Sequence, residues 1–328
     1  MLIFGIETSC DETACAIIKD GREVISNVVA SQIKTHEIFG GVVPEVAARE
    51  HLDTINVVIN ETFENAKKDF NISPDDIDAF ASTVGPGLVG CLLVGLNAAK
   101  ALSLCYDKPY IGVNHLQAHV CANFLESDLK PPFICLLVSG GHTQVIKVDD
   151  YDKQEIIAST IDDATGEVYD KAARLMGLSY PGGIKLDKLA QEGNKNAFKL
   201  PTAKVKENEF SFSGLKTAVL RLVQSYKGKE LPVNDICASF QETITTTLIN
   251  KTKFLADKYN IKTIVLSGGV AANSRLREKL FELQNEGYKT FAPKMKFCTD
   301  NAAMVASCAY FNPIKTDDSL ILEAFSRG

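Results

Sequence analysis

Several common sequence patterns are missing from this chain, and their absence narrows its class. The nine cysteines are scattered and include no Cys-x-x-Cys pair. An odd number of cysteines, several of them inside apolar segments, is typical of a protein kept in a reducing cytoplasm. Cys10 differs because it lies in a polar loop, but a single cysteine in a loop is by itself a weak sign of reactivity.

The chain also lacks an excess of positive charge and an uninterrupted apolar run. A net charge of -6 argues against a whole-surface polyanion binder, so contact with nucleic acid needs a local basic patch or a partner. The longest apolar stretch, residues 87–105, contains Asn97 and Lys100 and predicts a buried helix rather than a membrane span. The apolar start has no basic region and meets Glu7, which predicts a buried strand rather than a signal peptide. We therefore expect a cytoplasmic protein with no membrane association.

The organisation of the chain predicts two similar halves. Its 328 residues, 45% hydrophobic and 23% charged, suffice for two globular lobes. A strand, a polar turn and a return strand occupy residues 2–19 and again residues 133–148. A second pattern of strand, glycine turn and helix starts at residue 78 and again at residue 263. We predict a duplicated α/β fold of two lobes with a central cleft, the second lobe lengthened by helices between residues 160 and 260.

Phosphate-binding motifs of the best-known kinds are absent, but glycine turns are present. Neither the Walker pattern nor Gly-x-Gly-x-x-Gly occurs. The turns at residues 139–141 and 267–269 are Ser-Gly-Gly, and we expect a helix to follow the second one. Such turns let backbone N–H groups approach an anion, although most Gly-Gly pairs are ordinary turns. The Gly-Pro-Gly turn at residues 85–87 is a weaker third candidate.

Two histidines supply the main chemical signal. His115 and His119 are four residues apart, so a helix places both imidazoles on one face, one turn apart, where they can chelate a metal. Zinc peptidases of the His-Glu-x-x-His kind carry their general base directly after the first histidine, and here that position is Leu116. The pair thus offers a metal site without a neighbouring hydrolytic base. The alternative is two histidines that bind no ligand.

Six separated motifs resemble, in order, those of the tRNA N6-adenosine threonylcarbamoyltransferase family, formerly called O-sialoglycoprotein endopeptidases. They are Gly5-Ile-Glu-Thr-Ser-Cys-Asp-Glu-Thr13, Gly40-Gly-Val-Val-Pro-Glu45, Asn114-His-Leu-Gln-Ala-His119, Leu137-Val-Ser-Gly-Gly-His-Thr143, Ser267-Gly-Gly-Val-Ala-Ala-Asn273 and Thr299-Asp-Asn301. Residues 210–217 resemble the bacterial and organellar branch. The resemblance covers essentially the whole chain. It implies the ATPase fold shared by actin, sugar kinases and Hsp70 chaperones, with an N-terminal lobe of residues 1–130 plus 303–328 and a C-terminal lobe of residues 131–302.

The resemblance also implies a reaction. A threonylcarbamoyl group would pass from threonylcarbamoyl-adenylate to N6 of the adenosine 3′ of the anticodon in ANN-decoding tRNAs. Adenine N6 is a poor nucleophile, so the carbonyl must be made more electrophilic and the AMP leaving group stabilised. A divalent metal held by His115, His119 and Asp300 would serve as Lewis acid. By itself Asp300 looks like a helix N-cap, because small apolar residues follow it.

The remaining site residues are carried over from the family motifs. Asp11 would handle a proton or position the amine, with Glu12 beside it and Ser9 near the phosphate. Without the resemblance, Asp11 and Glu12 look like a solvated turn. The expected substrate-binding residues are Leu137, Val138, Ser139, Gly140, Gly141, Asp170, Gly183, Asp187 and Asn273. A His₂-carboxylate site suits Fe²⁺ or Zn²⁺, one per chain, and Mg²⁺ is expected with the nucleotide.

Partners and alternatives follow from the same resemblance. The expected partners are tRNA, a non-catalytic paralogue and ATPase helper proteins of the threonylcarbamoyladenosine pathway. Residues 44–70 predict a helix whose apolar stripe either packs on its own lobe or docks the paralogue. Two other functions stay open, a metallopeptidase and an ATPase or sugar kinase of the same fold. The residue after His115 argues against the first, and the histidine chelate argues against the second.

Overall fold

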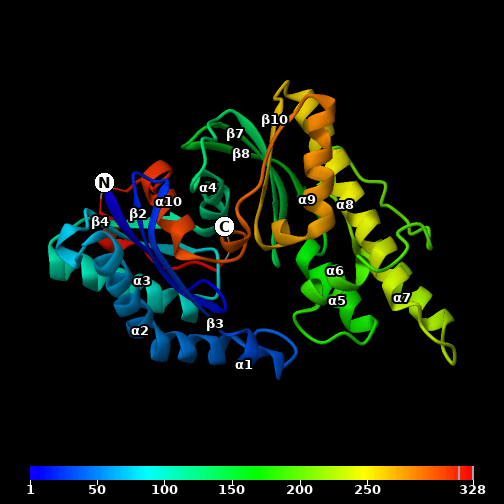
Figure 1. The fold of residues 1–328 in the computed structure, drawn as a ribbon, viewed down its shortest axis with the longest axis horizontal. Coiled ribbons are helices and arrows are strands. Elements are labelled where there is room, and N and C mark those ends of the chain that lie inside the picture. The colour runs from blue at the N-terminus through cyan, green and yellow to red at the C-terminus, as the bar shows by residue number, and fades with distance from the viewer. Residues whose placement is uncertain (317, 327–328) are drawn as a thin grey trace. The chain divides into compact units, whose positions relative to one another are not determined.

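The computed structural model describes residues 1–316 and 318–326, which fall into two compact units. Unit 1 comprises Met1–Lys130 and Thr299–Gly328, and unit 2 comprises Pro131–Cys298 (Figure 1). The first boundary lies where the sequence predicted it. The second differs, because residues 299–302 belong to unit 1 rather than to the C-terminal lobe. The predicted cleft between the lobes stays a prediction.

Unit 1 is built on a five-stranded mixed sheet of order β3-β2-β1-β4-β5. The strands are β1 (Leu2–Glu7), β2 (Glu12–Lys19), β3 (Glu23–Ser31), β4 (Ala79–Gly85) and β5 (Tyr110–Asn114). The first three form an antiparallel meander, and β4 and β5 extend it in parallel from β1. Parallel neighbours need crossover connections, which the helices of this unit supply.

Helices cover both faces of this sheet, and two adjacent residues of β1 show how. The ring of Phe4 stacks at 4.8 Å on Phe63 of α2 (Pro44–Phe70). The next residue, Gly5, faces α10 (Ala302–Phe311), and a Cβ at this position would lie 2.8 Å from the carbonyl oxygen of Ala302. Successive side chains of a strand point to opposite faces, so α2 and α10 lie on opposite sides of the sheet. Gly5 is required because α10 approaches the strand so closely.

Two predictions concern the helices of unit 1. The predicted helix at residues 44–70 is α2, and its stripe packs on its own unit because Ile55 and Val58 are buried in the core. The apolar stretch near residues 87–105 forms α3 (Val89–Tyr106), which is long and apolar enough to span a membrane. Its buried residues, which include Leu92, Leu96 and Ala99, recur at helical spacing. One face of α3 therefore packs on the sheet, as a core helix does.

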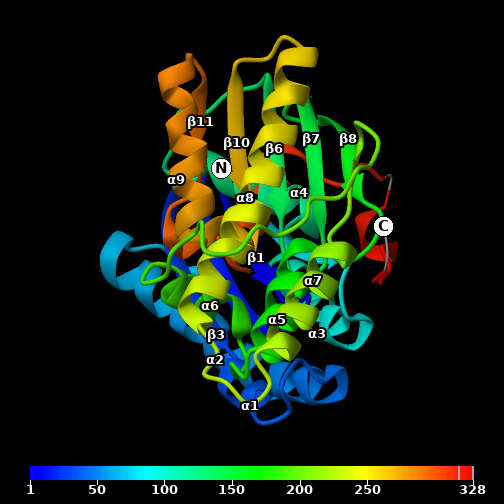
Figure 2. The ribbon, with the colours of Figure 1, turned by 90° about the vertical axis from the view of Figure 1, so that its right-hand side faces the viewer.

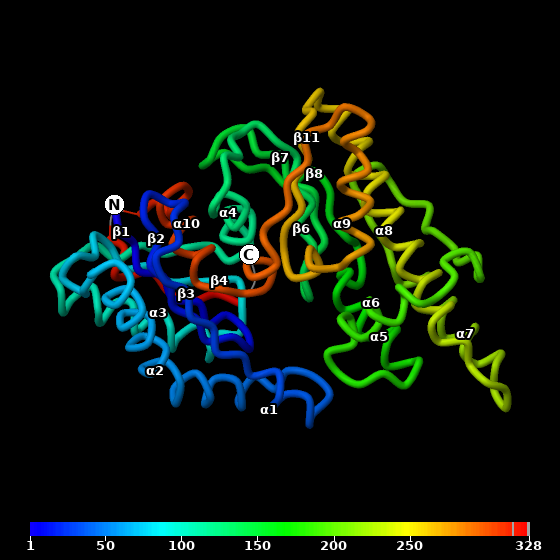
Figure 3. Tube along the Cα trace, viewed as in Figure 1, coloured from blue at the N-terminus to red at the C-terminus, as the bar shows by residue number. Residues whose placement is uncertain are grey.

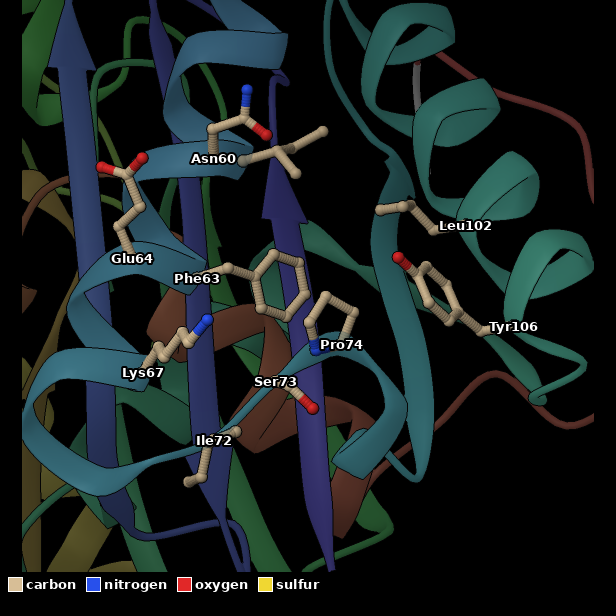
Figure 4. Close-up of a pocket in the computed structure, with 10 residues that line it drawn as sticks. Asn60, Phe63, Glu64, Lys67, Ile72, Ser73, Pro74, Leu102 and Tyr106 are labelled. Atoms are coloured by element: carbon tan, nitrogen blue, oxygen red, sulfur yellow. The ribbon is translucent and has the colours of Figure 1, made fainter.

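Figure 4 shows a cavity at the C-terminal ends of α2 and α3, and none of the candidate site residues lines it. Its volume is about 340 Å³. Its lining mixes apolar, amide and charged side chains: Ile59, Asn60, Phe63, Glu64, Lys67, Ile72, Ser73, Pro74, Leu102 and Tyr106.

Unit 2 repeats the topology of unit 1 in a sheet of order β11-β10-β6-β7-β8-β9. The strands are β6 (Phe133–Val138), β7 (Thr143–Asp150), β8 (Lys153–Thr160), β9 (Glu209–Phe210), β10 (Thr263–Ser267) and β11 (Lys289–Phe291). Strands β6, β7 and β8 form the antiparallel meander, and β10 and β11 extend it in parallel. Only the short β9 has no counterpart. The duplication predicted from the sequence is therefore present in the two sheets.

The helical insertion predicted for the second half is present as well. It consists of α5 (Thr165–Leu175), α6 (Gly182–Ala190), α7 (Ser213–Ser225) and α8 (Val233–Lys258), and α9 (Ser274–Glu282) follows β10. Figure 2 shows α8 and α9 in front of the sheet of unit 2, and Figure 3 follows the trace through α5, α6 and α7. The core of this unit joins the sheet to α8 through residues such as Leu136, Phe240, Ile244 and Leu266.

Candidate functional site

A short helix places the two histidines side by side. α4 (His115–Cys121) starts directly after β5, and its N-cap residue is Asn114, whose side-chain oxygen accepts hydrogen bonds from the N–H groups of Leu116 and Gln117. The rings of His115 and His119 are 4.7 Å apart, nearly edge to face. The run is therefore helical, and the four-residue spacing places both imidazoles on one face.

Asp300 reaches the same two rings from the other end of the chain. Its Oδ1 lies 3.1 Å from Nε2 of His119 and 3.7 Å from Nε2 of His115. The alternative interpretation of Asp300 as a helix cap is wrong. Asn301 caps α10 instead, accepting a hydrogen bond from the N–H of Met304. One potential ligand atom from each of the three residues lies within 4.8 Å of the others.

Glu7 orients this cluster, and the sequence analysis gave it no role. It ends β1 and is fully buried. Its Oε2 lies 3.2 Å from Nδ1 of His115 and accepts a hydrogen bond of 2.6 Å from the hydroxyl of Thr83, while Oε1 accepts one from the N–H of Ser9. A carboxylate on Nδ1 leaves Nε2 of His115 directed at Asp300. A carboxylate at the end of a buried apolar strand was the available signal, because a buried charge requires partners.

The charges of the cluster reinforce one another. Burial by itself lowers the pKa of His115, but the carboxylates of Asp300 and Glu7 outweigh burial and raise that pKa to about 9. Burial opposes ionisation of Asp300, yet His115 and His119 hold its pKa at about 2. The metal-free cluster is thus a cationic imidazole between two carboxylates. A metal ion must displace the proton of His115 to bind there.

The polar turn after β1 lies against the cluster. The hydroxyl of Ser9 is 3.2 Å from Nδ1 of His115, and its carbonyl accepts a hydrogen bond from the N–H of Leu88. Asp11 is only 8% exposed, so a freely solvated turn is not what the structure contains. Burial, followed by the charges of Asp300 and Asp11, raises the pKa of Glu12 well above its usual range. This environment favours the protonated form of Glu12 more than water does, because burial and neighbouring carboxylates disfavour its charge.

Cys10 in this turn is not an activated nucleophile. Burial and the charge of Asp11 raise the pKa of its thiol far above the usual range, which disfavours the reactive thiolate. All nine cysteines are free thiols.

The glycine turn after β6 presents mainly backbone. The side chains of Leu137 and Val138 are fully buried, so these two residues can offer a ligand only their backbone groups. Ser139 closes the turn through its hydroxyl, which accepts from the N–H of His142. A Cβ on Gly140 or Gly141 would meet no atom within 4 Å, which leaves open space beside this stretch of backbone.

Asp170 on α5 has one carboxylate oxygen that is hydrogen-bonded within unit 2. Oδ1 accepts hydrogen bonds from the N–H groups of Gly182 and Gly183, at 2.9 and 3.1 Å, where α6 begins. Burial raises the pKa of Asp170, and these two N–H groups partly offset the effect. Around Gly183 the backbone is accessible, since a Cβ there would meet only Tyr169, at 3.8 Å.

Asp187 and Asn273 are brought together, but largely to bind one another. Asp187 accepts hydrogen bonds from Asn273, Gln241, and both the N–H and the hydroxyl of Ser274. The side-chain oxygen of Asn273 accepts from the N–H of Leu276 and so caps α9. These contacts tie α6, α8 and α9 together. Both residues therefore stabilise the packing of these three helices, in addition to any contact with a substrate.

The helix expected after the second glycine turn is present. A 3₁₀ turn at Gly269–Ala272 comes first, and α9 starts at Ser274 with Asn273 as its N-cap. Gly268 itself has a φ of +86°, and a Cβ there would lie 2.3 Å from the carbonyl oxygen of Val138. Glycine is therefore required at position 268, where the backbone packs closely on β6.

Known proteins resemble this chain over most of its length. Residues 23–307 match the family model described as tRNA N6-adenosine threonylcarbamoyltransferase. The protein of that name from Caldicellulosiruptor saccharolyticus is 51% identical over 97% of this chain and 95% of its own length. The one from Gloeothece citriformis is 53% identical over 94% of this chain and 92% of its own.

Solved structures with lower identity share the fold. HypF from T. kodakarensis has a TM-score of 0.63 and 15% identity, covering 94% of this chain and 47% of that protein. Component A of the (R)-2-hydroxyglutaryl-CoA dehydratase from Acidaminococcus fermentans has a TM-score of 0.55 and 19% identity, covering 94% and 98%. Such identities support the fold alone. The full-length relatives and the family model together establish that this chain belongs to the tRNA N6-adenosine threonylcarbamoyltransferase family.

Proposed function

We propose that this chain transfers a threonylcarbamoyl group from threonylcarbamoyl-adenylate to N6 of the adenosine 3′ of the anticodon in ANN-decoding tRNAs. The observation that carries the proposal is the match to relatives of this name over 94–97% of the chain. The reaction joins the carbamoyl carbon to N6, breaks the bond from that carbon to the phosphate oxygen of AMP, and removes one proton from the amine.

A divalent metal fits the cluster of His115, His119 and Asp300. Two imidazoles and one carboxylate are fewer donors than Fe²⁺ or Zn²⁺ takes, so positions would remain for a substrate, and this donor set suits either ion. When bound, such an ion supplies a Lewis acid for the carbonyl or the leaving group. The buried carboxylate of Glu7 supports the assignment, because histidine ligands usually donate their second N–H to such a partner.

Residues of unit 1 then handle the amine. Asp11 is assigned to positioning or deprotonating N6, and Ser9 to the phosphate side. Glu12 is assigned to protonate the leaving oxygen of AMP, because burial and the charges of Asp300 and Asp11 raise its pKa.

Residues of unit 2 are assigned to the nucleotide. The backbone at Leu137–Gly141 offers N–H groups to phosphate and carbamoyl oxygens. Asp170 has one oxygen held by Gly182 and Gly183, which supports a role for the other oxygen on a ribose hydroxyl. Asp187 and Asn273 are assigned to support this region of the site, and Mg²⁺ to the phosphate of the nucleotide.

We propose further that the chain works with partner proteins. Its net charge of -6 gives no general attraction for tRNA phosphates. A non-catalytic paralogue and ATPase helper proteins would supply the basic surface that attracts the tRNA.

One reconstitution tests the function against its alternatives. Threonine, bicarbonate, ATP, an adenylate-forming partner and unmodified tRNA are incubated with the chain, and the nucleosides are analysed by mass spectrometry. Threonylcarbamoyladenosine that depends on this chain supports the proposal. Cleavage of a glycoprotein, or ATP turnover without tRNA modification, would instead support the metallopeptidase or the ATPase.

A further inference from the structure

Four buried polar side chains of unit 1 form a hydrogen-bonded group next to the polar turn. We call Thr13, Gln32, His36 and His51 the His51 network. Three of them are completely buried, and Gln32 is 6% exposed. They come from β2, the residue that links β3 to α1, α1 itself (Ile33–Glu37) and α2. Polar groups this deeply buried are costly unless they are paired, and the proposed chemistry uses none of them.

The bonds of His51 fix which nitrogen carries its proton. Nε2 lies 3.0 Å from the carbonyl oxygen of Cys10, which can only accept, so Nε2 is the donor. Nδ1 lies 2.7 Å from the hydroxyl of Thr13 and 3.3 Å from the amide nitrogen of Gln32, so it accepts from both. Burial lowers the pKa of His51, in keeping with a neutral ring.

Gln32 holds the next residue of the same turn. Its backbone N–H donates a hydrogen bond of 3.0 Å to the carbonyl of Asp11. Its side-chain oxygen accepts from Nε2 of His36 at 3.1 Å, and its amide also donates to the carbonyl of Ala47. The network therefore grips two consecutive carbonyls of the turn, those of Cys10 and Asp11, and anchors them to α1 and α2.

We propose that His51 and Gln32 are positioning residues for the transfer step: they hold the backbone at Cys10 and Asp11 so that the Asp11 carboxylate meets the attacking amine. This inference rests on the role proposed above for Asp11. A carboxylate displaced by about 1 Å loses much of its effect on rate, on the order of 100-fold, while substrate binding elsewhere is untouched. A purely structural role for the network lowers stability and leaves the rate of the folded protein unchanged.

Two near-isosteric substitutions separate the bonds of His51. In His51→Gln the side-chain nitrogen can take the place of Nε2 and donate to Cys10, but the acceptor for Thr13 is lost. In His51→Asn the side-chain oxygen can take the place of Nδ1 and accept from Thr13, but the donor to Cys10 is lost. Each variant removes part of a buried network, so both are expected to lose stability. Only His51→Asn loses the hydrogen bond to the carbonyl of Cys10 that holds the turn in place.

Single-turnover transfer with excess enzyme, threonylcarbamoyl-adenylate and tRNA is the deciding measurement. We expect His51→Asn to be roughly 10-fold to 100-fold slower and His51→Gln to be close to wild type. Bound metal and adenylate affinity should be unchanged in both. Hydrogen exchange of the peptide covering residues 8–14 should be faster in His51→Asn alone, and this readout does not depend on activity.

A double substitution tests whether His51 acts through Asp11. In an Asp11→Asn background, His51→Asn should cause no further loss of rate, because the group it positions is already gone. Wild-type transfer by His51→Asn, equal losses in His51→Asn and His51→Gln, or additive losses in the double variant would each overturn the inference while leaving the proposed function intact. Wild-type transfer by Asp11→Asn alone would remove the role of Asp11 and the inference together.

Discussion

The carboxylate of Glu7 lies 3.2 Å from Nδ1 of His115, joining the end of β1 to the start of α4 within the core of unit 1. The contact fixes the ring so that its other nitrogen is directed at Asp300. A histidine oriented in this way makes a better metal ligand, because less freedom is lost on binding and the ring is more basic.

The first prediction concerns Glu7. Glu7→Gln keeps the shape and removes the charge, so we expect the affinity of the cluster for Zn²⁺ to fall roughly 10-fold to 100-fold. Competition with a chromogenic chelator at pH 9 measures it, because at lower pH the loss of Glu7 also lowers the pKa of His115 and weakens the competition from its proton. Glu23→Gln, at an exposed position of β3, is the matched control and should bind as wild type does. Unchanged affinity in Glu7→Gln would mean that Glu7 only stabilises the fold.

The second prediction concerns the ligands. His115→Ala combined with His119→Ala removes two of three donors, so we expect about one tightly bound ion per chain to be lost. Elemental analysis of the purified protein, with circular dichroism to confirm folding, is the measurement. Metal content equal to that of wild type in a folded double variant would place the ion elsewhere.

Much of this fold could be predicted because its patterns are local. The buried strand at residues 133–138 and the helix at residues 44–70 are continuous in the sequence and bounded by turns or proline, and the structure has both with the same limits. The reason for the glycine at position 268 could not be predicted. A glycine packed against a neighbouring strand and a glycine that lets an anion approach look alike until that strand is known.

The site was harder to predict because it depends on long-range contacts. His115 and His119 are four residues apart, so one helix brings them together. Glu7 is separated from His115 by 108 residues, and only the pairing of β1, β4 and β5 brings the two together. The hydrogen bonds from Gln32 and His51 to the polar turn likewise form only when β3 and α2 lie beside that turn. Such pairings leave no periodic trace in the sequence.

The third prediction concerns pH. The pKa of His115 is raised to about 9 in the metal-free protein, so a proton competes with the metal below that pH. We expect apparent Zn²⁺ affinity to rise roughly tenfold per pH unit between pH 7 and 9, with about one proton released per ion. The ion pairs of the metal-free form act in the opposite direction. A raised histidine pKa stabilises the fold fully below pH 6.5, and this stabilisation is lost as the pH rises through about 9. Calorimetry in buffers of different ionisation enthalpy counts the protons, and a pH-independent affinity would contradict the charge state assigned to His115.

The fourth prediction separates two carboxylates of unit 2. In Asp187→Asn the amide oxygen can still accept from Gln241 and Asn273, which share Oδ1, but the amide nitrogen then faces the N–H of Ser274. Unit 2 should therefore lose about 2 kcal/mol of stability. Asp170→Asn keeps an acceptor for Gly182 and Gly183 and should lose little stability, while adenylate binding weakens. Thermal denaturation and adenylate titration of both variants decide. Equal stability losses would mean that both residues serve mainly to hold the unit together.

The last prediction concerns Asp11, because it separates chemistry from binding. Asp11→Asn keeps the size of the side chain and removes its charge. The groups proposed to bind the adenylate, the glycine turn after β6 and Asp170, belong to unit 2, so adenylate binding should change little. Transfer should fall by roughly 100-fold or more, the usual loss when a positioned acid–base group is removed. Calorimetric titration with threonylcarbamoyl-adenylate and single-turnover transfer, on one preparation, provide the two numbers. If Asp11→Asn transfers at the wild-type rate, Asp11 has no role in the chemistry and only forms part of the turn. Matched losses of affinity and rate would instead make it a substrate anchor, because an interaction that acts only in the transition state leaves ground-state binding unchanged.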